Sequence, residues 1–370
     1  MKRVVAIALV LLLHLPRASA QPSLPRSTPE AQGISSKGIT DFLTAASASK
    51  NEFHSFMFLR HGQVIAEGWW SPYVADLKHP LYSISKSFTS TAVGLAVSEG
   101  RLSVDDKVVS FFPNDLPANI SPALAAMTVK DLLTMREGQD PDPTGPVTSG
   151  DTNWIKGFLA LPIVHTPGTS FLYNTLGVYI LSAIVQKVTG QKVIDYLRPR
   201  LFEPLGISGE NWAVSPQGIN TGGWGLSLKT EDMAKFGQLY LQQGMWNGQQ
   251  ILPKTWIAQA VTSYNDQGPS WSWPTPKDSS DWRQGYGYLF WRCRHNAFRA
   301  DGAMGQYIIV LPDQDAVIAI TCKTNDMQDE INLVWRYLLP SIHKGVLPED
   351  KAATASLRHA LASLSVPVAH

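Results

Sequence analysis

The feature that most constrains the fold is the placement of strand-like segments near both ends of the 370-residue chain. Residues 53–70 read FHSFMFLRHGQVIAEGWW, two apolar runs that meet at His61 and Gly62 and are typical of a β-hairpin. Strand-like runs return only from Tyr286 onward, as YGYLFWRC, AFRADGA, QYIIVLP and AVIAITCK. Because short turns separate these late runs, we expect an antiparallel meander. The sequence therefore predicts one sheet built from both chain ends.

Helical patterns fill the space between the strands. Apolar residues recur at helical spacing over 83–99, and Gly100 follows as a stop signal. TVKDLLTM, GVYILSAIVQKVTG and TEDMAKFGQLYLQQG are further helices, and MQDEINLVWRYLLPSI closes the pattern. This order predicts an α+β fold in which helices flank the antiparallel sheet. We expect one domain over residues 21–345, with a mainly helical insertion at about 100–225, and a C-terminal tail over 346–370.

The first twenty residues have the pattern of a targeting segment. Lys2 and Arg3 precede an apolar run at 4–15, which is too short to span a bilayer, and residues 18–20 read ASA. This combination predicts a secretory signal peptide over 1–20, cleaved before Gln21, with a membrane anchor as the alternative. We therefore expect an exported protein, periplasmic or secreted, without a stable membrane anchor after cleavage.

Charge, cysteine content and histidine spacing indicate which partners and bound groups to expect. The formal charge is +1 and there is no basic run, which argues against a nucleic-acid partner. Cys293 and Cys322 lie at the ends of predicted strands and could pair in an oxidising compartment, although two buried thiols fit the sequence equally well. The nine histidines are scattered without metal-ligand spacing, so neither a metal site nor a cofactor is expected.

The stretch LYSISKSFTS places Ser83 and Lys86 three residues apart at the start of a predicted helix. Residues i and i+3 share a helix face, so the lysine can reach the serine hydroxyl and act as its base. A lysine that works as a base near neutral pH needs its pKa lowered by roughly 3 units, which burial can supply. The alternative, a solvated helix start, remains open on this spacing alone.

Longer segments resemble a known family. YSISKSFTSTAVGLAVSEGRLSVDDKV is similar to the nucleophile helix of the serine β-lactamase and penicillin-binding-protein superfamily. PGTSFLYNTLGVYILSAIVQKVTG and GGWGLSLKTEDMAKFGQLYL resemble later blocks of the same superfamily, in the same order. The nearest branches are class C β-lactamases and the related carboxylesterases and D-aminopeptidases. The resemblance covers roughly residues 33–338 and implies that Ser83 is the nucleophile.

The resemblance also implies partners for Ser83. The catalytic tyrosine of the family falls on Tyr173, which would relay the proton between Ser83 and the leaving group. Two places later the family often has Asn, and here Thr175 stands at that position as a candidate substrate contact. The family match assigns the oxyanion hole to the backbone N–H groups of Ser83 and Ala303.

The third motif departs from the family pattern. Lys-Thr-Gly of the class C enzymes is replaced by Ala300-Asp301-Gly302, so the cation is missing. Arg299 is adjacent, but strand alternation is expected to point it to the other face. Gly302 would let the strand approach the substrate, and Asp301 would repel a carboxylate. These residues favour neutral esters or amides over penicillins.

The resulting hypothesis is an exported serine hydrolase that works through an acyl-enzyme on small esters or amides without a cofactor. A β-lactamase, a D-Ala-type peptidase and an amide-oligomer hydrolase are alternatives within the family. A non-hydrolytic, penicillin-recognising binding or sensor protein is the alternative from another class. The absence of a GxSxG motif argues against an α/β-hydrolase. Trp271, Trp273 and Trp282 are candidates for an aromatic rim, or for ordinary packing of a long loop.

Overall fold

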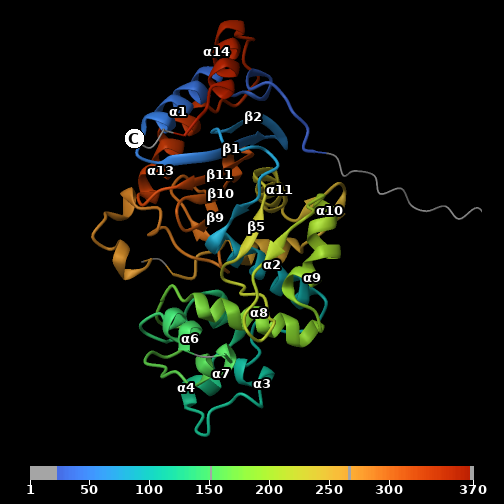
Figure 1. Cartoon of the computed structure of the whole chain (residues 1–370), viewed down its shortest axis with the longest axis vertical. Coiled ribbons are helices and arrows are strands. Elements are labelled where there is room, and N and C mark those ends of the chain that lie inside the picture. Colours follow the sequence, from blue (N-terminus) through green and yellow to red (C-terminus); the bar gives the residue numbers. More distant parts are fainter. Residues whose placement is uncertain (1–22, 151, 266–267, 367–370) are drawn as a thin grey trace, which may run out of the picture.

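The computed structural model describes residues 23–150, 152–265 and 268–366. The expected signal peptide over 1–20 lies outside these residues. A six-stranded antiparallel sheet forms the upper half of the molecule (Figure 1), in the order β2-β1-β11-β10-β9-β8. Its strands are β1 (Glu52–Arg60), β2 (Gln63–Trp69), β8 (Trp291–Arg292), β9 (Phe298–Gly302), β10 (Gln306–Leu311) and β11 (Ala316–Lys323). The prediction of a sheet built from both chain ends is therefore confirmed.

The centre of the sheet is where the two chain ends meet. β1 pairs antiparallel with β11 along its whole length, so that Arg60 lies opposite Ala316 and Glu52 opposite Lys323. β8 is much shorter than the run YGYLFWRC suggested, because Leu289 adopts a positive φ of 63° just before it. The long, continuously buried strands β10 and β11 give the sheet a rigid middle.

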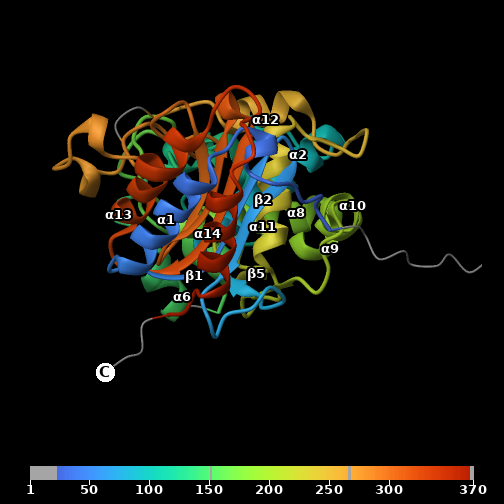
Figure 2. The same cartoon turned by 90° about the horizontal axis from the view of Figure 1, so that it is seen from above.

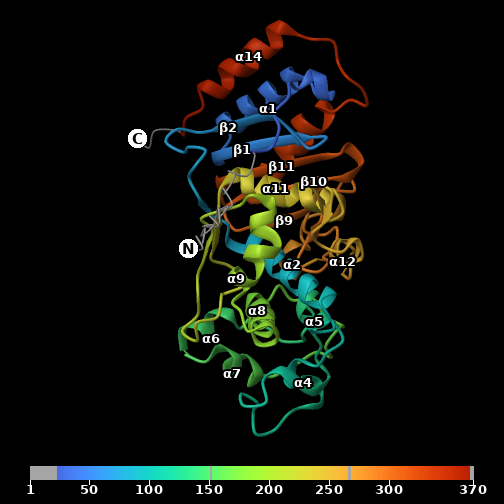
Figure 3. The same cartoon turned by 90° about the vertical axis from the view of Figure 1, so that its right-hand side faces the viewer.

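Helices cover both faces of the sheet (Figure 3). On one face lie α1 (Ser36–Ala48), α13 (Met327–Leu333) and α14 (Lys351–Ala362), and on the other lies α11 (Thr230–Leu241). Phe42 of α1 packs on Phe56 of β1 with ring centroids 5.0 Å apart. On the other side Gly237 of α11 approaches Val317 so closely that a Cβ would lie 2.6 Å from it. The three layers account for the flanking helices that the apolar periodicity predicted.

The C-terminal segment differs from the expected tail. α14 lies alongside α1 and against β2 (Figure 2), and Leu357 and Leu364 are buried there. Gly68 of β2 leaves room for Leu364, since a Cβ at Gly68 would lie 2.6 Å from that side chain. Residues of the predicted tail therefore form part of the helical layer over the sheet.

Most of the inserted region forms the lower half of the molecule in Figure 1, while α10 (Glu203–Leu205) lies at the height of the sheet near α11. Besides α10, the region contains α3 (Val108–Phe111), α4 (Pro122–Ala126), α5 (Val129–Leu133), α6 (Thr144–Gly150), α7 (Trp154–Leu159), α8 (Thr175–Thr189) and α9 (Val193–Leu197). A small sheet of β3 (His79–Pro80), β5 (Leu226–Leu228) and β4 (Asn211–Trp212) joins this region to the rest. Two further short elements follow α11, the hairpin β6 (Met245–Trp246) and β7 (Gln249–Gln250) and the helix α12 (Lys254–Ala260).

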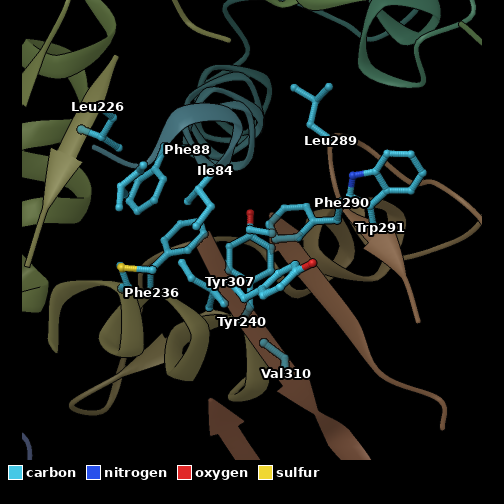
Figure 4. Packing of buried hydrophobic residues seen from close by; sticks show 14 of the residues in the cluster. Ile84, Phe88, Leu226, Phe236, Tyr240, Leu289, Phe290, Trp291, Tyr307 and Val310 are labelled. Carbon is cyan, nitrogen blue, oxygen red and sulfur yellow. The ribbon is translucent and has the colours of Figure 1, made fainter. Parts of the chain in front are cut away.

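Helix α2 (Ser85–Ser98) connects the two halves. It is buried from Ser85 to Ala96 and contacts both α8 and α9 of the helical region. Figure 4 shows Ile84 and Phe88 packed toward α11 and the sheet, and the rings of Phe88 and Phe236 stack with centroids 3.9 Å apart. The N-terminal end of α2 is thereby fixed at the junction of sheet and helical region.

Candidate active site

Ser83 and Lys86 lie at the N-terminal end of α2. Ser83 is in a short turn, Tyr82–Ile84, that runs directly into the helix, and it is half-buried while Lys86 is buried. Tyr82 has a positive φ of 46°, which is uncommon for a residue with a side chain. This sharp entry presents the Ser83 hydroxyl outward and the Lys86 amine beneath it. The Nζ atom of Lys86 lies 2.8 Å from Oγ of Ser83.

The surroundings of Lys86 favour its neutral form. Burial lowers the pKa of Lys86 to about 7, and the carboxylates of Asp301 and Asp142 oppose this only in part. The amine donates a second hydrogen bond, 2.9 Å long, to the carbonyl oxygen of Gly223. No carboxylate among the described residues forms an ion pair with it. Lys86 therefore has the lowered pKa that a lysine base requires, and burial causes the shift.

Tyr173 completes a three-residue cluster with Ser83 and Lys86. Nζ of Lys86 lies 4.9 Å from the centre of the Tyr173 ring. Burial raises the pKa of Tyr173 above its ordinary value, although a hydrogen bond with the Ser83 side chain opposes the shift. The ring is held by Trp291, which stacks on it at 5.6 Å, and by Tyr286 at 6.2 Å. The phenol is therefore neutral and positioned to donate its proton.

A cavity of about 400 Å³ opens beside Ser83. Tyr173, Asp301 and Ala303 line it together with Ser83. The remaining wall consists of the indoles Trp271, Trp282 and Trp291, small polar residues of the loop before β8, and residues Asn325, Asp326, Met327 and Gln328 at the start of α13. Aromatic walls with a few polar groups are typical of sites that bind small molecules.

The β9–β10 hairpin reaches the nucleophile through Gly302. A Cβ at Gly302 would lie 2.2 Å from the carbonyl oxygen of Leu81, so only glycine allows β9 to pass the backbone just before Ser83. The close approach that we expected toward the substrate is thus made to the protein backbone, and Gly302 does not line the cavity. Its neighbour Ala303 is exposed and does line it. This places the two predicted oxyanion donors, at Ser83 and Ala303, beside the same cavity.

Thr175 is not brought to this cavity. It is the first residue of α8, and its methyl group faces Gly223, where a Cβ would lie 2.6 Å from it. The preceding residue, Asn174, is buried at the helix N-cap and donates a 2.8 Å hydrogen bond to Gln139. Thr175 therefore does not line the cavity expected to hold substrate, because the turn into α8 directs it against the Gly222-Gly223 loop.

A buried cation, Arg299, directly precedes the third motif on β9. Strand alternation does place Arg299 opposite Ala300, as expected, but it also places Arg299 on the same face as Asp301. Nη2 of Arg299 lies 2.8 Å from Oδ2 of Asp301, and Nε donates to the same oxygen at 3.0 Å. As expected, Arg299 therefore does not reach the cavity, although it contacts Asp301, which does line it. The guanidinium lies behind Asp301 and is fully buried.

Cys293 and Cys322 are both free and buried. Cys322 is on β11, and Cys293 directly follows β8, with β9 and β10 lying between those two strands. Three strand spacings amount to about 14 Å, which is well beyond the separation of about 7 Å that a disulfide can bridge. The structure therefore contradicts the disulfide alternative and agrees with two buried thiols.

Sequence reasoning missed several residues of the site. Trp291 stacks on Tyr173, and the Gly223 carbonyl accepts from Lys86, yet neither residue was singled out. Asn325 to Gln328 reach the cavity because α13 begins against β10, where Tyr307 donates to the Met327 carbonyl at 2.9 Å, and no local pattern indicates this contact. Of the three tryptophans predicted as candidates for an aromatic rim, Trp271 and Trp282 line the cavity, whereas Trp273 does not.

Two searches of the described ranges gave no candidates. Within residues 23–150, 152–265 and 268–366, no three or more His, Cys, Asp or Glu side chains gather in a way that could hold a metal ion. In the same ranges no helix combines the length and the hydropathy that crossing a bilayer requires.

Comparison with known proteins agrees with this geometry. The family model described as Beta-lactamase matches residues 54–339. A 6-aminohexanoate-dimer hydrolase from Paenarthrobacter ureafaciens is 24% identical over 287 residues, which cover 71% of each chain. Penicillin-binding protein 4 from Amycolatopsis lactamdurans is 26% identical over 315 residues, covering 75% of this chain and 80% of that protein.

A solved structure shows the same fold. A protein from Bacillus anthracis, provisionally assigned as a 6-aminohexanoate-dimer hydrolase, superposes with a TM-score of 0.71 at 18% identity. The superposition covers 89% of this chain and 90% of the other. The match of the family model over most of the chain, together with this fold, establishes that the chain belongs to the Beta-lactamase family, within the superfamily of serine β-lactamases and penicillin-binding proteins.

Proposed function

We propose that this protein is a serine hydrolase that cleaves small neutral esters or amides through an acyl-enzyme on Ser83. The observation that carries the proposal is the 2.8 Å contact between Oγ of Ser83 and the amine of Lys86, whose pKa burial lowers to about 7. At neutral pH a substantial share of this amine is uncharged and can accept a proton. A buried base in contact with a half-exposed hydroxyl is the arrangement that activates a serine nucleophile.

The acylation step follows from these contacts. Lys86 takes the proton of the Ser83 hydroxyl as Oγ attacks the substrate carbonyl carbon. The backbone N–H groups of Ser83 and Ala303 stabilise the resulting oxyanion. When the tetrahedral intermediate collapses, the bond to the leaving alcohol or amine breaks. The leaving group takes the phenolic proton of Tyr173, which regains a proton from Lys86.

Deacylation reverses the proton path. A water molecule near Tyr173 gives a proton to the Tyr173–Lys86 pair and attacks the acyl carbon. The ester bond to Ser83 breaks and Oγ recovers its proton, which releases the carboxylic acid. Every proton that leaves in the first half returns in the second, so no cofactor enters the reaction.

The cavity supports a neutral acyl group. None of the residues that line it is a lysine or arginine, and its charged lining residues are Asp301 and Asp326. Substrates that carry a carboxylate, such as penicillins, would find no exposed cation there. A second candidate within the family is the hydrolysis of short amide oligomers, because one relative over most of the chain is named a 6-aminohexanoate-dimer hydrolase.

We also propose that the protein is exported to the periplasm or secreted. The apolar run at 4–15 with Lys2 and Arg3 before it and ASA after it supports this proposal. Sequencing the N-terminus of protein recovered from the producing cells tests it. Mature chains are expected to begin at Gln21, and chains that still begin at Met1 in the cytoplasm would contradict it.

Labelling with a fluorescent fluorophosphonate tests the nucleophile. The wild type is expected to label at one residue and to turn over a 4-nitrophenyl ester, whereas Ser83→Ala should do neither. Ser85→Ala is a matched control, since Ser85 begins α2 two residues after Ser83 but donates its hydroxyl to the Tyr82 carbonyl at 2.6 Å. Full ester hydrolysis by Ser83→Ala would refute the mechanism. A stoichiometric adduct without turnover in the wild type would instead support a sensor.

A further inference from the structure

A buried cation lies directly behind one wall of the cavity. Arg299 is 0% exposed, and its guanidinium carbon lies 4.6 Å from the ring centre of Trp282 and 5.5 Å from that of Trp291. Both indoles line the cavity, whereas Arg299 does not. A positive charge therefore lies directly behind the residues that line the cavity, without reaching the cavity itself.

Within the part of the chain that the structure describes, a single carboxylate pairs with this cation. Oδ2 of Asp301 contacts Nη2 and Nε of Arg299 at 2.8 and 3.0 Å. Nη1 donates to the main-chain carbonyl of Asp281 at 2.9 Å. The carboxylate of Asp281 is engaged elsewhere, since Arg294 lies 2.8 Å from it and Trp335 donates to it at 2.9 Å. The charge balance at Arg299 therefore depends chiefly on Asp301.

Asp301 stands between the cation and the cavity. It is 8% exposed and lines the cavity together with Ser83, while Arg299 behind it is completely covered. The charges of Arg299 and Asp301 lie 2.8 Å apart, so their electrostatic effects on a substrate in the cavity largely cancel. Removing the carboxylate would leave a full positive charge that the indole rings screen only weakly.

We propose that Asp301 sets the charge preference of this site by masking Arg299, so that the cavity selects uncharged acyl groups over acyl groups that carry a carboxylate. This inference rests on the proposed function, because it concerns the acyl group that Ser83 would accept. It differs from simple repulsion by Asp301. Under masking, the selectivity comes from cancelling a cation that is already present, so it should depend on Arg299.

The test compares two esters of similar size, 4-nitrophenyl butyrate and the monoanionic 4-nitrophenyl hemisuccinate. The measured quantity is the ratio of kcat/KM for the anionic ester to that for the neutral ester, at low ionic strength. In Asp301→Asn we expect this ratio to rise at least tenfold above that of the wild type. The double variant Arg299→Met/Asp301→Asn should return the ratio to within about threefold of the wild type.

Each outcome decides the question. If Asp301→Asn is active and its ratio stays within twofold of the wild type, masking is overturned. If the single and the double variant rise equally, simple repulsion by Asp301 explains the selectivity and masking is again overturned. Should Asp301→Asn fail to fold, the double variant alone still decides, because masking predicts a ratio near that of the wild type and repulsion predicts a rise. Absence of Ser83-dependent turnover of both esters in the wild type would contradict the proposed function instead.

Discussion

Two basic side chains are buried beside the same cavity, and their partners give them opposite roles. Lys86 contacts the Ser83 hydroxyl and the Gly223 carbonyl, and its amine has a pKa of about 7. Arg299 contacts the carboxylate of Asp301 at 2.8 Å. Burial alone would lower the pKa of Arg299, but the neighbouring acidic groups outweigh it and raise that pKa. Burial with neutral partners yields a base, whereas burial with a carboxylate yields a permanent charge.

The same comparison separates the Ser83–Lys86 motif, which matches the family pattern, from the Ala300–Gly302 motif, which departs from it. The Ser83–Lys86 turn has the spacing typical of its family, and the structure places its atoms in contact. The β9 segment lacks the cation that the family carries at that motif and instead holds Arg299 one layer deeper. We infer that the chemistry resides in the first region and the substrate charge preference in the second.

The largest expected effect is the loss of activity when Lys86 is replaced. Lys86→Met removes the base and should lower kcat/KM for a 4-nitrophenyl ester by about 10³-fold, within the range of general acid–base catalysis. Lys235→Met is a matched control, because Lys235 is also buried but donates to the Gly206 carbonyl away from the cavity. Steady-state kinetics checks both variants. A Lys86→Met enzyme within tenfold of the wild type would exclude the amine as the base.

The role of Arg299 as a permanent charge can be tested by measuring the stability of the protein. Arg299→Leu leaves the Asp301 carboxylate buried without its partner, and we expect a loss of about 3–5 kcal/mol in the free energy of unfolding. Chemical denaturation at pH 7 measures this loss. In Arg299→Met/Asp301→Asn the uncompensated charge is absent, so most of the loss should be recovered. Equal stability of the wild type and Arg299→Leu would show that the ion pair does not hold the β9 region.

The main pH dependence of activity follows from Lys86. The neutral form of Lys86 is the active one, so kcat/KM should rise about tenfold per pH unit below pH 7 and level off above it. Arg299 keeps its charge throughout this range and contributes no step. A pH–rate profile from pH 5 to 9 checks the expectation. A profile that is flat between pH 5 and 8, or that falls through pH 7, would be inconsistent with a neutral lysine base.

The smallest expected effect concerns the rim of the cavity. Trp271 is 62% exposed and lines the cavity, so an acyl group that covers its ring would bury apolar surface. Trp271→Ala should raise KM for an aromatic ester about fivefold, equivalent to about 1 kcal/mol, with little change in kcat. Trp273→Ala is the control, because Trp273 is 53% exposed but does not line the cavity. Equal changes in the two variants would remove Trp271 from the proposed binding surface.

Local patterns were sufficient to predict much of the fold. The β1–β2 hairpin follows from alternation and His61-Gly62, and α2 follows from helical spacing that ends at Gly100. The packing of α14 in the C-terminal tail was not predicted, because its small and polar residues carry little apolar signal and the helix packs on α1 and β2. Propensity describes a segment by itself, whereas this helix depends on a partner more than 300 residues earlier in the chain.

Spacing along the chain indicated the site only where a single turn determines it. Ser83 and Lys86 are three residues apart, so helix geometry brings them together, whereas Tyr173 and Ala303 were named from the family resemblance and line the same cavity. The direction of Arg299 was predicted correctly from alternation, but its ion pair with Asp301 on the same face was not foreseen. Thr175 was misjudged because its direction depends on where α8 begins, which tertiary contacts with Gly223 determine.

The charge state of Lys86 is the central quantity, and NMR titration measures it most directly. Protein labelled with ¹³C at the ε position of lysine should show one resonance that titrates near pH 7, and Lys86→Met should lack that resonance. The exposed lysines are expected to titrate near their ordinary value of about 10.4. A spectrum in which the Lys86 resonance titrates above pH 9 would contradict the neutral base and, with it, the proposed activation of Ser83.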